Sequence, residues 1–119
     1  MKQPMDTLSD TLNARLSYLY SLSDGWADCG QGKEIDRIAL QATIMLLNYS
    51  SRSLPEPNLI PMEEGSIGVE WTDLINMLII NVHADHFDFH NYDQNGDVIH
   101  SLGFRFNEIE KMMDLIQKK

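Results

Sequence analysis

The sequence predicts an α+β fold in which helices cover one face of an antiparallel sheet. Apolar residues recur at helical spacing near both ends of the chain, whereas apolar and polar residues alternate in the middle. With 119 residues and 43% hydrophobic content, the chain has the size of one domain with a single core. We therefore treat residues 1–119 as one domain, divided into a helical hairpin (1–52), an acidic sheet (53–104) and a C-terminal helix (105–119).

Three amphipathic helices follow from the 3.6-residue period of the apolar residues. The first is expected over residues 5–22 and the second over 33–51, and a short third helix covers about 105–118. Apolar stripes of this kind usually face a core, so we expect Leu16 and Ile38 to be buried.

A glycine-rich segment, residues 22–35, connects the first two helices. Gly25 follows the expected end of the first helix, where a left-handed residue commonly closes the last turn, and Trp26 is expected to pack into the core beneath this corner. The single cysteine, Cys29, has no cysteine partner, and all four histidines lie in or beside the predicted sheet. Cys29 is therefore assigned no role.

The middle of the chain predicts an antiparallel meander of about four strands. It follows the stretch SLPEPNLIP, which is too rich in proline for a helix interior. Asn95-Gly96 predicts a type I′ hairpin turn, and Trp71 and Ile79 are expected to be buried. The expected strands span residues 67–72, 75–83 (apolar on both faces, as in a central strand), 86–92 and 98–102.

Several residues of the connecting segment and of the first expected strand form a wider pattern. They are Gly25-Trp26, Asp28, Gly30, Pro55, Pro57, Gly65 and Ile67-Gly68-Val69-Glu70-Trp71. Through these residues, the chain resembles a widespread group of small bacterial and mobile-element proteins that share the pattern GWDGxG … P … DGxIxLEW. The resemblance covers about residues 22–90. It departs from the pattern at Ala27 and Asp28, where the group tends to have Asp then Gly, and at Glu64 in place of Asp. The resemblance implies no catalytic residue, because the group has no general function assigned.

Histidines and acids concentrate in residues 82–100. His86, Asp88 and His90 alternate and would line one face of a strand, and two imidazoles with a carboxylate can hold a transition metal. The same alternation also describes the polar face of an exposed strand whose other face carries Phe87 and Phe89. We expect the exposed strand, and therefore no metal, no cofactor and no catalytic residue. A small metal-dependent enzyme is the alternative.

Charge is divided unevenly along the chain. Residues 53–104 contain nine acids and no Lys or Arg, whereas the flanking residues contain nine acids and nine bases, so the formal net charge of −9 belongs to the sheet. An acidic surface of one sign repels nucleic acid and membrane phosphates and attracts basic proteins. Acids on loops and edges also keep a sheet soluble, and the sequence leaves these two explanations open.

Together these observations predict a non-enzymatic acidic protein that binds and inhibits a basic, nucleic-acid-binding partner. It would be a nucleic-acid mimic from a phage or mobile element, such as an anti-CRISPR inhibitor, with an antitoxin or immunity protein as the alternative binding protein. Direct binding to nucleic acid or membrane is not expected, and a homodimer is compatible with the sequence. The single cysteine and the lack of a long apolar run or secretory signal predict a cytoplasmic location. The residues expected to contact the partner are Glu70, Asp85, Asp88, His90, Tyr92, Asp93 and Asp97.

Overall fold

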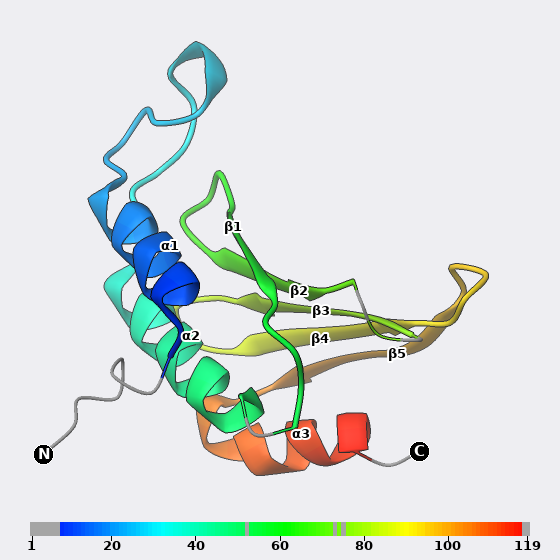
Figure 1. Cartoon of the computed structure of the whole chain (residues 1–119). Helices are drawn as coiled ribbons and strands as arrows, with labels where there is room; N and C mark the ends of the chain where they lie inside the picture. Colours follow the sequence, from blue (N-terminus) through cyan, green and yellow to red (C-terminus); the bar gives the residue numbers. More distant parts are fainter. Residues whose placement is uncertain (1–7, 52, 73, 75, 118–119) are drawn as a thin grey trace, which may run out of the picture.

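A computed structural model of the chain describes residues 8–51, 53–72, 74 and 76–117, and within them it contains three α-helices and one antiparallel sheet (Figure 1). The helices are α1 (Asp10–Ser21), α2 (Arg37–Ser50) and α3 (Ile109–Gln117), and short 3₁₀ turns span Asp28–Gly30 and Phe106–Glu108. The strands are β1 (Asn58–Pro61), β2 (Ile67–Trp71), β3 (Met77–Val82), β4 (Phe87–Tyr92) and β5 (Val98–Phe104). The α+β prediction is confirmed.

The sheet is a meander in which each strand pairs with the next along the chain, in the order β1-β2-β3-β4-β5. β3 is the middle strand, as its apolar sequence predicts. The expected number of about four strands is too low. The additional strand is β1, which lies in the proline-rich stretch where the sequence predicts no strand. A proline fits at Pro61 because it ends a strand at the edge of the sheet, where one side of the backbone needs no partner.

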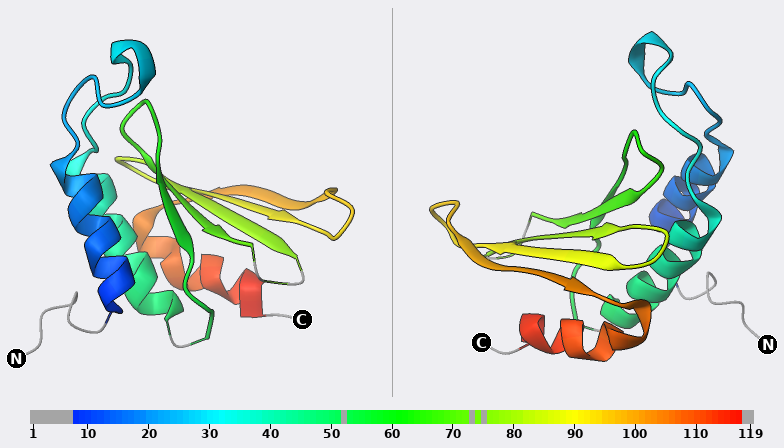
Figure 2. Two further views of the ribbon diagram at one scale, coloured as in Figure 1. Left: turned by 45° about the horizontal axis from the view of Figure 1, so that its top comes forward. Right: turned by 180° about the vertical axis from the view of Figure 1, so that it is seen from behind.

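One face of the sheet forms the core with the helices. The fully covered side chains of the two central pairings are Ile67, Val69, Trp71, Leu78, Ile80, Val82, Phe87 and Phe89. Ile79 points to the other face and is only half-buried, so the expectation that it is buried is wrong. β3 is covered by helices on one face alone. Figure 2 shows α1 and α2 side by side, with the β4–β5 turn extending away from them.

The apolar stripes of α1 and α3 are confirmed. Leu12, Leu16 and Leu19 of α1 are buried, as are Ile109 and Met112 of α3. None of the helices in the described ranges is long and apolar enough to cross a membrane.

The buried face of α2 is rotated from the one that the sequence predicts. The Asp36 carboxylate caps the helix by accepting hydrogen bonds from the N–H groups of Ile38 and Ala39, so α2 begins later than expected. Within α2, Ala39, Ala42 and Leu46 are buried against the core, while Ile38 is 54% exposed. The predicted burial of Ile38 is therefore wrong, because α2 packs on the sheet through Ala39, Ala42 and Leu46, and Ile38 lies beside that stripe on the outer side of the helix.

Gly25 and Trp26 belong to a loop and not to a helix cap above the core. α1 ends at Ser21 with Leu22 in an extended conformation, and the N–H of Gly25 donates to the carbonyl of Gly32 at 2.7 Å. Trp26 is half-buried against Gly32, and its Nε1–H donates to the Lys33 carbonyl at 2.6 Å. Gly25 is left-handed as expected, with a φ of +87°, but it lies beyond the end of α1 and does not cap it. The predicted burial of Trp26 in the core is wrong, because the loop closes on itself before the indole can reach the core.

The part of this loop that leads into α2 is joined to the β1–β2 turn by backbone hydrogen bonds. The N–H of Lys33 donates to the Glu63 carbonyl at 2.8 Å, and the N–H of Asp36 donates to the Gly65 carbonyl at 2.9 Å. Gly65 has a φ of +98° and lies against the backbone of Glu34. Gly25, Trp26 and Gly65, which carry the resemblance described above, therefore all support this junction of loop and turn.

We expect Gly65→Ala to destabilise the protein more than Gly96→Ala. Both glycines have a left-handed φ, which costs a residue with a side chain about 1–2 kcal/mol. A Cβ at Gly65 would also lie 3.0 Å from the Glu34 carbonyl oxygen, whereas one at Gly96 would meet nothing within 4 Å. Urea unfolding of both variants measures the difference. Equal losses would show that the junction is not tightly packed.

The turn between β4 and β5 differs from the type I′ turn that Asn95-Gly96 predicts. Only Gly96 has a positive φ, and its N–H donates to the Asp93 carbonyl, as in a type I turn followed by a left-handed glycine. The Asp93 carboxylate accepts hydrogen bonds from the N–H groups of Asn95 and Asp97, each at 2.9 Å. This carboxylate stabilises the longer turn in preference to the two-residue one.

Candidate functional site on the open face of the sheet

The face of the sheet turned away from the helices, here called the open face, is lined by two neighbouring cross-strand rows. One row consists of Glu70, Ile79, His90 and Ser101. The other consists of Gly68, Asn81, Asp88 and Gly103. Glu70, Asp88 and His90 are half-buried, since neighbouring strands flank them but none of the helices in the described part of the chain covers this face. The open face is therefore a polar surface on a rigid sheet.

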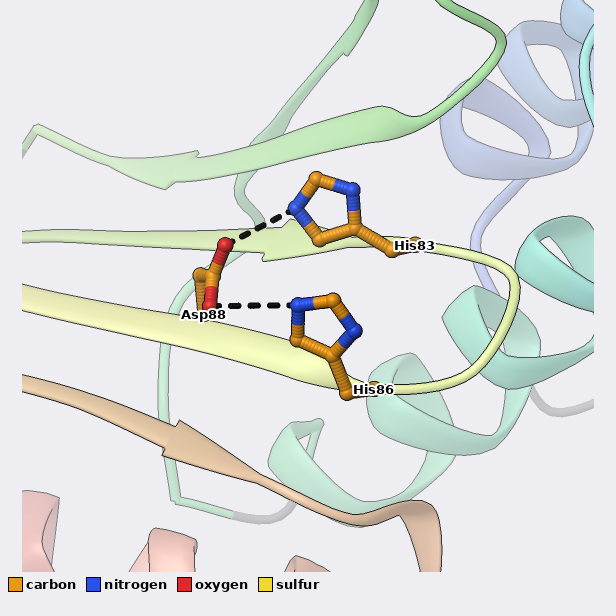
Figure 3. A group of neighbouring side chains, drawn as sticks. All are labelled: His83, His86 and Asp88. Carbon is orange, nitrogen blue, oxygen red and sulfur yellow. Dashed lines mark hydrogen bonds and ion pairs between the residues drawn. The ribbon is translucent and has the colours of Figure 1, made fainter.

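Two histidines and an aspartate meet at the end of this face where β3 turns into β4 (Figure 3). His83 Nε2 lies 2.9 Å from Asp88 Oδ2, and His86 Nε2 lies 3.3 Å from Asp88 Oδ1. The two imidazole rings are stacked, with centroids 4.5 Å apart and planes 14° from parallel. We call His83, His86 and Asp88 the His–Asp group.

The hairpin itself brings the two histidines together. The N–H of His83 donates to the carbonyl of His86 at 2.9 Å, closing a turn of two residues, Ala84 and Asp85. Alternation along β3 and β4 then places both histidines on the same face as Asp88. The arrangement follows from backbone pairing and does not depend on a flexible loop.

A second carboxylate contacts the outer side of the group. Asp85 Oδ1 lies 2.6 Å from His86 Nδ1. The hydrogen bond with Asp85 raises the pKa of His86, and the negative charge of Asp88 adds to this effect. The same hydrogen bond lowers the pKa of Asp85. His86 is thus held between two carboxylates, one at each ring nitrogen.

The seven residues predicted to contact a partner extend along the open face from one end of β4 to the other. Asp85 and Asp88 lie at the β3–β4 turn with the two histidines. The other five lie toward or in the β4–β5 turn, and we call them the distal acidic surface: Glu70, His90, Tyr92, Asp93 and Asp97. β4 has six residues, so about 17 Å separates its ends.

The alternative metal set of His86, Asp88 and His90 is not brought together. His86 and His90 are four positions apart in an extended chain, a span of about 13 Å, which is too far for one ion. The His90 Nδ1 instead pairs with the Ser101 hydroxyl at 3.1 Å. The third member of the cluster is His83, which sequence reasoning missed. Its signal was the spacing His83-Ala84-Asp85-His86, which fits a two-residue hairpin turn that places the two histidines opposite each other.

Two kinds of chemistry are open to these residues. Imidazole nitrogens and a carboxylate oxygen that converge on one point can hold a cation or move a proton. The acids of the distal acidic surface can accept hydrogen bonds from, and attract, the cationic side chains of another protein.

No protein-family model matches the chain, and comparison with curated proteins and with solved structures gives no match either.

Proposed function

We propose that the protein is a non-enzymatic inhibitor that binds a basic, nucleic-acid-binding protein through the open face of its sheet. Such a protein would act as a nucleic-acid mimic, of the anti-CRISPR kind that phages and mobile elements encode. The observation that carries the proposal is that the open face and its adjoining turns carry half-buried or exposed acids, within residues 53–104 that contain no Lys or Arg.

The distal acidic surface is the part of the open face best suited to such a partner. Glu70 and His90 flank the half-buried Ile79 across three adjacent strands, and Tyr92 pairs with Met77, which is 41% exposed. Apolar and aromatic groups of this kind commonly anchor an interface, while the surrounding acids speed encounter and select a basic partner. Asp93 and Asp97 extend the negative charge along the β4–β5 turn.

The rigidity of this surface favours recognition over solubility alone. The Asp93 carboxylate is fixed by two backbone N–H groups, and β4 is paired on both sides. A preordered charged surface loses little conformational entropy on binding. Acids that serve only solubility need no fixed arrangement.

Capture of a partner from bacterial lysate, followed by displacement, tests the proposal. We expect the immobilised protein to retain a basic protein that duplex DNA or RNA then releases, because both ligands would occupy one surface. Retention should weaken as salt rises, since the screening length falls from about 30 Å at 0.01 M to about 10 Å at 0.1 M. A captured protein that nucleic acid does not displace, and whose retention ignores salt, would contradict the mimic.

An antitoxin or immunity protein would use an acidic surface in the same way. The identity of the partner separates the two: a toxin encoded beside this chain supports the antitoxin, and a nucleic-acid-guided defence enzyme supports the anti-defence inhibitor.

A further inference from the structure

We infer that the His–Asp group binds a divalent transition-metal ion of the Zn²⁺ class, with His83, His86 and Asp88 as its three protein ligands. One ligand atom from each of the three residues lies within 4.8 Å of the other two. The Nε2 atoms of both histidines face the carboxylate of Asp88, and the two histidines lie on either side of the β3–β4 turn (Figure 3). The site is separate from the distal acidic surface, and the inference does not depend on the proposed function.

The distances within the group are close to those that a bound ion requires. Ligand bonds of about 2.0–2.2 Å at a tetrahedral angle place two ligand atoms about 3.3–3.6 Å apart. The separation of His86 Nε2 from Asp88 Oδ1 is 3.3 Å and already fits. His83 Nε2 lies 2.9 Å from the other oxygen of the same carboxylate, Oδ2. An ion bound by Oδ1 therefore requires the His83 ring to turn toward that oxygen, within a group whose three ligand atoms already lie within 4.8 Å of one another.

Asp85 supplies a second, independent feature of metal sites. A histidine that binds a metal through one ring nitrogen usually donates the N–H of the other to a carboxylate or carbonyl, which fixes the tautomer and orients the ring. The Nδ1 of His86 lies 2.6 Å from Asp85 Oδ1, which leaves Nε2 directed at Asp88.

The composition and exposure of the group determine which ion it suits. Two imidazoles and one carboxylate favour Zn²⁺ and related ions over Mg²⁺ or Ca²⁺, which prefer ligand sets made of oxygen. The side chains of His83, His86 and Asp88 are 26%, 40% and 37% exposed, and the neighbouring Gly103 places no side chain over Asp88. Three protein ligands and an accessible fourth position are typical of exchangeable or reactive zinc sites, whereas structural sites are closed by four.

Titration of the untagged full-length protein with ZnCl₂ by calorimetry tests this inference. We expect one Zn²⁺ to bind per chain and MgCl₂ to give no binding. His83→Ala and His86→Ala should each abolish or strongly weaken binding. Asp85→Asn, which leaves the three ligands intact, should weaken it about 10- to 100-fold. A circular-dichroism spectrum like that of the parent would verify that each variant is folded.

His90→Ala is the matched control, because His90 lies on the same face and strand but pairs with Ser101. It should leave the affinity for Zn²⁺ unchanged. In the parent, imidazole NMR signals of His83 and His86 should shift on addition of Zn²⁺, while those of His90 and His100 should not. Absence of stoichiometric binding, or an equal loss in His90→Ala and His86→Ala, would overturn the inference.

Discussion

Replacing Trp71 with alanine is expected to lower the free energy of unfolding by about 3–5 kcal/mol, as large-to-small changes of a buried aromatic residue do. Trp71 is 1% exposed and pairs with Leu78 at the end of β2, on the core face of the sheet. Its Nε1–H also donates to the Pro55 carbonyl at 2.9 Å, which ties β2 to the segment before β1. The substitution therefore leaves a cavity and also removes that hydrogen bond.

Urea unfolding of three variants separates these contributions. Trp71→Phe retains most of the buried volume and should cost less than Trp71→Ala. Trp26→Ala removes an indole of the same size from the half-buried loop and should also cost less, because Trp26 packs on Gly32 and not in the core. If Trp71→Ala unfolded at the same urea concentration as the parent, the assigned register of β2 would be wrong.

The sequence predicts those helices and strands that bury one regular face of apolar residues. The apolar stripe of α1 and the alternation of β2 and β4 correspond to a covered face, so their residues match the pattern. β1 could not be predicted, because it follows two prolines and contains a third, Pro61, which is tolerated only at an edge, and edges are a property of the complete sheet. The exposure of Ile38 likewise depends on which side of α2 packs on the sheet, and that side is set by the tertiary contacts of Ala39, Ala42 and Leu46.

The candidate site could be predicted only where it follows one strand. Alternation correctly placed Asp88 and His90 on one face of β4. It could not show that His83 lies across a two-residue turn from His86, because that contact joins two strands. Nor could alternation show that Asp85 and Asp97 lie near opposite ends of β4, since the lengths of the strands set that separation.

Reversing two charges of the distal acidic surface is expected to weaken binding to the captured basic partner by about 100-fold. Placing like charges opposite each other in an interface costs several kcal/mol, and each factor of ten in affinity corresponds to about 1.4 kcal/mol. Glu70→Lys and Asp97→Lys are suitable because Glu70 lies on the open face and the hydrogen bonds of Asp97 in the turn come from its backbone N–H and carbonyl. Neither change touches the His–Asp group.

A matched double variant changes the net charge equally elsewhere. Asp10→Lys and Asp114→Lys alter exposed positions on α1 and α3. Bulk electrostatic attraction would weaken in both double variants alike, whereas a local interface would respond only to the first.

The dissociation constant of the partner for these two double variants, measured side by side at one salt concentration, tests the central claim most directly. We predict a loss of about 100-fold for Glu70→Lys with Asp97→Lys and nearly unchanged binding for Asp10→Lys with Asp114→Lys. Equal losses, or no loss in either variant, would contradict binding through the open face of the sheet.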